Sequence, residues 1–139
     1  MDAGNGAQKA GDILIKAFAK KGVYVYIEPI IPAEISPPKR TPHSMSGVVI
    51  RLASNEINNI GSYSNFVIVE HEILLKRRLV DKEFSKDATI LIDDGDQKRA
   101  ADAYQEAISD AQKGGAAVSA FSITDTAKDI IKELNGNGK

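Results

Sequence analysis

Short apolar runs alternate with amphipathic segments along the chain, and this alternation predicts strands and helices in turn. Apolar runs rich in β-branched and aromatic residues are typical of strands inside a sheet, and they cover residues 23–27, 47–52, 66–69, 89–92 and, more weakly, 116–121. Apolar residues that recur every three or four positions indicate helices that bury one face, and they do so over residues 8–21, 70–79, 97–113 and 124–134. Strands that alternate with helices predict a layered α/β fold.

Each predicted helix has apolar residues that we expect to face the sheet. In chain order these sets are Ile13, Leu14, Ala17 and Phe18; Ile73, Leu74 and Leu79; Ala101, Tyr104, Ile108 and Ala111; and Ala127, Ile130, Ile131 and Leu134. Gly22 and the pair Gly114–Gly115 are natural stops for the first and third helices. Thr124 is expected to cap the last helix.

All five prolines lie in residues 28–45, between the first two predicted strands. Proline fixes φ and removes a backbone donor, so this segment is predicted to be neither a helix nor a central strand. A long loop stiffened in this way is often functional. Because no helix separates the two flanking strands, we expect the mostly parallel sheet to be mixed.

A glycine turn, Gly4-Asn5-Gly6, stands directly before the first predicted helix. Such a turn points free backbone N–H groups and the positive end of the helix dipole at one place, where an anion such as phosphate is the natural guest. Lys39 and Arg40 would supply compact positive charge from the proline segment. The alternative is that the turn needs glycine only for its backbone angles, and that Lys39 and Arg40 are a solvated surface pair.

Composition narrows the functional classes. The chain has 139 residues, enough for one domain, and a net charge of -1, which implies no general attraction to nucleic acid or to an acidic membrane surface. It has no apolar run long enough to span a bilayer, so a cytoplasmic location is expected. It also contains no cysteine, and therefore no thiolate ligands for an iron–sulfur cluster or a structural zinc ion.

Several motifs of catalysis are missing. The glycine turn is not followed by Gly-Lys-Ser/Thr, so it is not a nucleotide P-loop. His71-Glu72 begins a zinc-protease pattern, but Leu75 stands where the second histidine must be. The acidic turn at residues 93–96 lacks the further oxygen ligands of a calcium loop. We therefore expect no catalytic residue and no metal site in this chain.

The glycine turn also allows a second interpretation, a dinucleotide site in place of a simple phosphate site. Gly4-Asn5-Gly6 opens a G-x-G-x-x-G pattern, and Glu28 follows the next strand, where a ribose-binding carboxylate would lie. In such sites the third glycine allows close packing of the helix on the strand. Here Lys9 occupies that position, which argues against a dinucleotide site.

Three stretches of the first half resemble one family in the right order. They are the glycine turn with its glutamine and later glycine (residues 2–12), the Pro-Ala-Glu-Ile loop (residues 29–35), and the segment from Lys39-Arg40 through the next strand to Glu56-Ile57. They resemble the gamma-type domain of the 2-oxoacid:acceptor (ferredoxin) oxidoreductases. The closer resemblance is to the version at the N-terminus of 2-oxoglutarate-type alpha subunits.

The resemblance implies a three-layer α/β/α domain in an enzyme that decarboxylates a 2-oxoacid on thiamine diphosphate. The acyl group passes to coenzyme A and the electrons pass to ferredoxin. Thiamine diphosphate, magnesium and iron–sulfur clusters are expected on the partner alpha/beta subunits only. The isolated chain is expected to be inactive, and its role is subunit assembly together with contacts to coenzyme A.

Within that resemblance, we expect one domain over residues 1–139 that is incomplete at both ends, because the family has a strand before the glycine turn and a further helix at the end. The candidate ligand-binding residues are Gly4, Asn5, Gly6, Gln8, Lys39 and Arg40. Two alternatives remain open, namely a non-catalytic scaffold for partner subunits and a Rossmann-like dinucleotide-binding domain.

Overall fold

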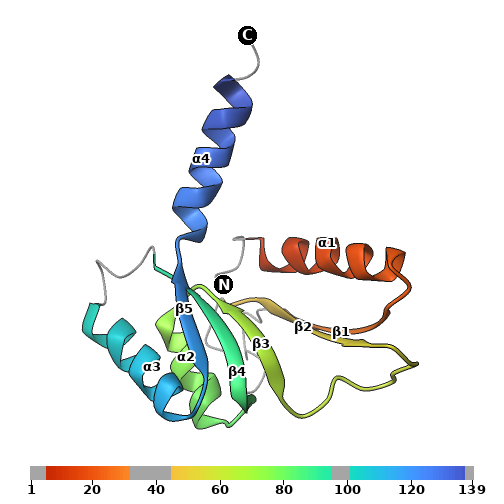
Figure 1. The fold of residues 1–139 in the computed structure, drawn as a ribbon, viewed down its shortest axis with the longest axis horizontal. Coiled ribbons are helices and arrows are strands. Elements are labelled where there is room, and N and C mark those ends of the chain that lie inside the picture. Colours follow the sequence, from red (N-terminus) through yellow and green to blue (C-terminus); the bar gives the residue numbers. More distant parts are fainter. Residues whose placement is uncertain (1–5, 32–44, 95–100, 137–139) are drawn as a thin grey trace. The chain divides into compact units, whose positions relative to one another are not determined.

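The computed structural model describes residues 6–31, 45–94 and 101–136. Within these ranges the chain forms four helices and five strands, and the α/β class is confirmed (Figure 1). The chain divides into two compact units: unit 1 is Met1–Tyr63 and unit 2 is Ser64–Lys139. The expectation that residues 1–139 form a single domain stays a prediction. Antiparallel and parallel strand pairs are both present. The antiparallel pair forms one sheet, and the parallel strands form a second, separately hydrogen-bonded sheet.

Unit 1 is a helix on a β-hairpin. Its elements are α1 (Ala7–Lys20), β1 (Tyr24–Ile30) and β2 (Gly47–Ala53). The two strands are antiparallel, with Tyr24 opposite Ala53 at one end and Ile30 opposite Gly47 at the other. Helix α1 packs on both strands, so the described part of unit 1 is a two-layer structure.

Strand β1 runs further than its apolar pattern predicts. Pro29 lies inside it, opposite Val48, so the proline segment begins as strand. In a two-stranded sheet each strand keeps an outer edge that makes no ladder bonds, and a residue without an N–H is tolerated there. The same position explains why β1 is not the buried strand we expected, since four of its seven residues are exposed.

The buried face of α1 also differs from the prediction. Its buried residues are Ala7 and Gly11, whereas the predicted inward set (Ile13, Leu14, Ala17 and Phe18) is exposed, with Ile13 at 60%. Small residues let a helix approach its strands closely. Here close approach, and not the largest apolar side chains, decides which face of the helix is buried.

Unit 2 is a parallel three-stranded sheet with helices in its crossovers. Its elements in order are β3 (Ser64–Val69), α2 (Glu72–Val80), β4 (Phe84–Asp93), α3 (Ala101–Lys113), β5 (Ala117–Phe121) and α4 (Ile123–Gly136). The strand order is β3-β4-β5, so each crossover moves one strand along the sheet. Helices α2 and α3 pack against each other as well as on the strands. They therefore lie on the same face of the sheet, as right-handed crossovers require.

The core of unit 2 lies between that face and the two helices. Tyr104, Leu75, Ile90 and Ile92 have the largest fully buried side chains. Leu75 is buried where we expected Ile73, which is instead exposed. Ile73 and Leu75 lie about 200° apart around the helix, on either side of the buried Leu74. A buried face that includes Leu74 can therefore extend to one of them but not to both, and the spacing did not say which. The predicted strand at residues 66–69 is also not central, because β3 pairs only with β4 in the described residues.

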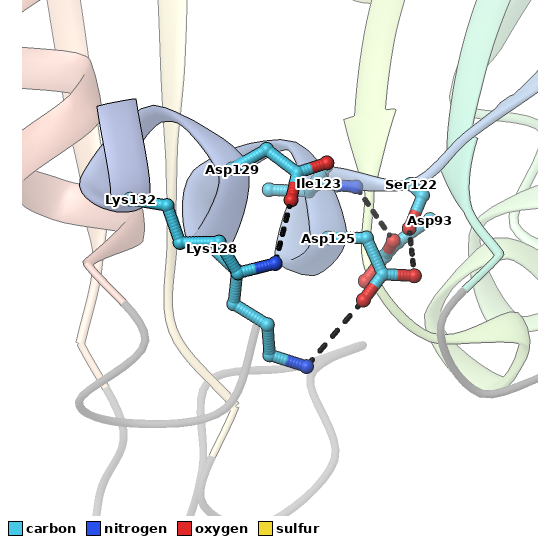
Figure 2. Close-up of polar contacts among 7 residues, drawn as sticks. All are labelled: Asp93, Ser122, Ile123, Asp125, Lys128, Asp129 and Lys132. Atoms are coloured by element: carbon cyan, nitrogen blue, oxygen red, sulfur yellow. Dashed lines mark hydrogen bonds and ion pairs between the residues drawn. The ribbon is translucent and has the colours of Figure 1, made fainter. Parts of the chain in front are cut away.

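Helix α4 begins earlier than we expected, so Thr124 is not its cap. Thr124 lies inside the helix, and the residue before the helix is Ser122. The Ser122 hydroxyl donates to the Asp125 carboxylate at 3.1 Å, and Asp93 of β4 accepts the backbone N–H of Ile123 at 3.0 Å (Figure 2). The buried Asp93 carboxylate thus ties the end of β4 to the start of α4 and suits the positive end of the helix dipole.

The two sides of α4 have opposite character. Ion pairs join Asp125 to Lys128 at 3.4 Å and Asp129 to Lys132 at 3.0 Å along one side (Figure 2). At about 100° per residue, the apolar residues lie on the opposite side. The predicted apolar set of this helix is correct as a pattern, but its members are exposed in the structure: Ala127, Ile130, Ile131 and Leu134.

The turn after α3 supplies a test of the unit 2 fold. Gly115 has φ +100°, and a Cβ there would lie 2.5 Å from the Lys86 carbonyl oxygen. We expect Gly115→Ala to lower the free energy of unfolding by about 2–4 kcal/mol, from backbone strain and the clash together. Gly22→Ala is the control, because Gly22 has φ +77° but nothing within 4 Å. Urea unfolding followed by circular dichroism measures both, and equal losses would contradict the clash.

Candidate functional site

The start of α1 has the geometry of an anion site. Gly6 precedes the helix with φ 85° and ψ 10°, a left-handed conformation that favours glycine. The first intrahelical bond runs from the Ala10 N–H to the Gly6 carbonyl at 2.8 Å. The N–H groups of residues 7–9 precede that bond, and helix geometry leaves them without an acceptor in the helix itself. This end of α1 therefore offers backbone donors and the positive end of the dipole.

Gln8 links this helix start to the hairpin. Its side-chain amide Nε2 donates to the Ile30 carbonyl at 3.4 Å, which is long and therefore weak. Ile30 is the last residue of β1 and pairs with Gly47, the first residue of β2. The start of α1, the end of β1 and the start of β2 thus lie at one end of unit 1. The chain leaves and re-enters this end on either side of residues 32–44.

Two of the six predicted ligand-binding residues are placed by the structure. Gly6 and Gln8 lie together at the start of α1, and both are exposed. Gly4, Asn5, Lys39 and Arg40 lie outside the described residues. Nothing in the described chain tests a ligand role for any of the six.

Gly11, the later glycine of the stretch that carries the family resemblance, has a packing role that the sequence reasoning did not assign to it. It is buried, and a Cβ at this position would lie 2.4 Å from Val48 Cγ1 and 3.2 Å from Val48 Cβ. Side-chain rotation cannot remove the second contact, because Cβ is fixed to the backbone of β2. A glycine inside a helix costs about 1 kcal/mol relative to alanine, and this cost was the available signal that Gly11 has a packing role.

The dinucleotide hypothesis gains no specific support from this geometry. Gly11 serves the close-packing role of a third glycine, two residues beyond Lys9. However, β1 runs antiparallel to β2, whereas dinucleotide sites form in parallel β–α–β units. In the described part of unit 1 no parallel neighbour stands beside β1. Glu28 lies within β1, opposite Val49, and not at the end of the strand.

Helix α2 carries three consecutive basic residues, Lys76, Arg77 and Arg78, and all three are engaged in ion pairs. Arg77 pairs with Asp81 at 3.1 Å. Lys76 pairs with Glu106 of α3, and Arg78 pairs with Glu83. Each of the three basic side chains thus has an acidic partner, and two of them lie in the last turn of α2. The Lys76–Glu106 pair is the more exposed and contributes little to stability, whereas the side chains of Arg78 and Glu83 are only 23% and 17% exposed.

His71 and Asp93, which belong to the metal-binding patterns considered above, have structural roles at the starts of helices. His71 takes the N-cap position of α2, where its carbonyl accepts the N–H groups of Leu74 and Leu75. Asp93 holds the start of α4. Across residues 6–31, 45–94 and 101–136, no three histidine or acidic side chains gather as a metal site requires. None of the helices in these same ranges is long and apolar enough to cross a membrane.

Comparison with known proteins adds no identification. A scan against protein-family models finds no match, and a search of curated proteins finds no significant match. The family resemblance of the first half of the chain therefore stays a proposal.

Substitution of Gly11 tests the contact that positions α1. We expect Gly11→Ala to lower the free energy of unfolding by about 1–3 kcal/mol, because overpacking against Val48 outweighs the gain of about 1 kcal/mol in helix propensity. Val48→Ala removes both γ-carbons but keeps Cβ. In that background the Gly11→Ala penalty should fall by about half or more. Urea unfolding of the four proteins measures the coupling, and strictly additive penalties would contradict the contact.

Proposed function

We propose that this chain is a gamma-type domain or subunit of a thiamine-diphosphate-dependent 2-oxoacid:ferredoxin oxidoreductase. Its part is subunit assembly and contact with coenzyme A. The observation that carries the proposal is the end of unit 1 where the α1 N-terminus, with Gln8, lies beside the end of β1 and the start of β2. The resemblance of the glycine turn and the proline segment to that family adds the chemical class of the ligand.

Coenzyme A suits this end of unit 1 because it is rich in phosphate. Backbone donors at a helix start bind phosphate oxygens well. In the proposal, Gly4, Asn5 and Gly6 let the chain approach the ligand, and Gln8 donates from the first turn. Lys39 and Arg40 belong to the segment that leaves this end of the hairpin, and they would bring positive charge to the phosphates.

The chemistry of decarboxylation falls to partner subunits in this proposal. They hold thiamine diphosphate, magnesium and the iron–sulfur clusters, and ferredoxin accepts the electrons from the whole complex. The present chain has no cysteine to hold a cluster. It is then a cytoplasmic component of a multisubunit enzyme, inactive by itself, with no role in nucleic acid or membrane binding.

A second candidate is a scaffold that binds partner subunits and no small ligand. Exposed apolar side chains on α4 and on the strands of unit 2 favour it, because such surface is usually covered by a partner. This candidate predicts tight association with the alpha/beta subunits and no affinity for coenzyme A.

Calorimetric titration with coenzyme A tests the first candidate. We expect binding by the full chain, and about tenfold or greater weakening in Lys39→Ala/Arg40→Ala, because charge-assisted bonds to phosphate are lost. Gln8→Ala should weaken binding less. Lys20→Ala/Lys21→Ala is the matched control, since it removes the same charge at the opposite end of α1 and should leave affinity unchanged.

Titration with NAD separates the coenzyme A proposal from the dinucleotide and scaffold alternatives. Heat with NAD but not with coenzyme A would overturn the proposal in favour of a dinucleotide domain. Heat with neither ligand, together with co-purification of partner subunits, would favour the scaffold.

A further inference from the structure

Unit 2 carries two apolar surfaces that no described element of this unit covers. The first is the sheet face opposite α2 and α3, here called the open face. Side chains alternate along each strand, so the register places Phe66, Ile68, Leu91 and Phe121 on it. Phe66 is 57% exposed, and Ile68 and Phe121 are each 48% exposed.

The second surface is the apolar side of α4, here called the α4 stripe: Ala127, Ile130, Ile131 and Leu134. Its three large side chains are 51%, 56% and 70% exposed in that order. A lone amphipathic helix of this length is marginal in water, and most of its stability must come from packing of its apolar side. The α4 stripe therefore needs a partner surface.

The connection to α4 directs the helix away from its own sheet. Only Ser122 separates β5 from α4, whereas connections between strands and helices in α/β units commonly take two to six residues. The bond from the Ile123 N–H to Asp93 and the bond from Ser122 to Asp125 hold this exit. Figure 1 shows α4 continuing beyond the end of β5 instead of turning back along the sheet.

We propose that the chain forms a symmetric dimer through unit 2, in which α4 of each copy packs its stripe on the open face of the other. The two surfaces match in length, because the 14 residues of α4 span about 21 Å and the paired strands about 17 Å or more. An exchange of identical elements about a two-fold axis closes on itself and uses every copy of both surfaces.

The charge pattern fits the same occupant. Within the paired stretches of the three strands, the open face presents uncharged Thr89 and Ser119 beside its apolar residues, and the acidic residue there, Asp93, is engaged with Ile123. Asp87 alternates onto the same side of β4, but it is exposed and precedes the stretch that pairs with β5. The Asp125–Lys128 and Asp129–Lys132 pairs lie on the far side of α4 and stay solvated when the stripe is covered. Docking then leaves no charge buried without a partner.

The area is sufficient for a dimer. Six half-exposed large side chains per copy offer on the order of 100 Å² each, since a buried aromatic side chain covers about 150–250 Å². The two reciprocal contacts together bury about 1,200 Å², the lower end of stable interfaces. Pairing of the two stripes alone would bury about half of that. The inference rests on unit 2 only and is independent of coenzyme A binding.

Sedimentation velocity of the full chain tests the dimer. At about 100 µM we expect a dimer of a 15.0 kDa chain. Leu134→Lys in the stripe and Phe66→Lys on the open face should each raise the dimer Kd by about tenfold or more, because a charge is placed in an apolar contact. Asp129→Lys on the charged side of α4 is the control and should leave the Kd within about twofold. A monomeric wild-type chain would overturn the proposal.

Cross-linking tests the exchange geometry. Because the chain has no native cysteine, links can form only at the introduced cysteines. Copies with Phe66→Cys are mixed with copies with Leu134→Cys and treated with a flexible bis-maleimide. The proposal predicts linked dimers that contain one copy of each variant. Links only between two Leu134→Cys copies would overturn it in favour of stripe-to-stripe pairing. Internal links in a chain that carries both substitutions, with no linked dimers, would show that α4 folds onto its own sheet.

Discussion

One-sided burial of the strands governs what this chain keeps available for binding. In unit 2, both crossover helices lie on one face of the parallel sheet, and Leu75, Ile90, Ile92 and Tyr104 fill the space between. Each of the three aliphatic side chains contributes about 1.5–3 kcal/mol when fully buried. The opposite face receives no comparable cover from the described elements of unit 2, so its apolar residues remain free to bind another surface. This explains the exposure of Phe66, Ile68 and Phe121 on that face.

Unit 1 follows the same constraint with a different outcome. A single helix covers the hairpin, and Gly11 lets it approach β2 closely. That contact fixes α1 along the strands, so the helix start lies beside the end of β1 and the start of β2, where Gln8 reaches Ile30. The backbone donors of the first turn consequently lie at the same end of unit 1 as Ile30 and Gly47. A packing contact in the middle of the helix thereby determines the position of the proposed ligand site at its end.

The amino-acid pattern predicted where elements lie better than which side of each element is buried. The strands and helices of unit 2 formed where alternation and helical spacing indicated, and Gly114–Gly115 ended α3 as expected. Spacing alone did not distinguish Ile73 from Leu75 on α2, and it favoured the large residues of α1 over Ala7 and Gly11. For the site, the glycine turn indicated the left-handed conformation of Gly6. The bond from Gln8 to Ile30 joins residues 22 positions apart, and only the folded hairpin brings them together.

The most direct test of the coenzyme A proposal is a residue-level measurement. Backbone amide resonances of the isotope-labelled full chain would be followed by NMR during titration with coenzyme A. The account predicts that the largest shift changes fall on Ala7, Gln8 and Lys9, the donors of the first turn of α1, with smaller changes at Ile30 and Gly47. Saturable shift changes confined to other parts of the chain, or none at all, would contradict a phosphate site at the glycine turn.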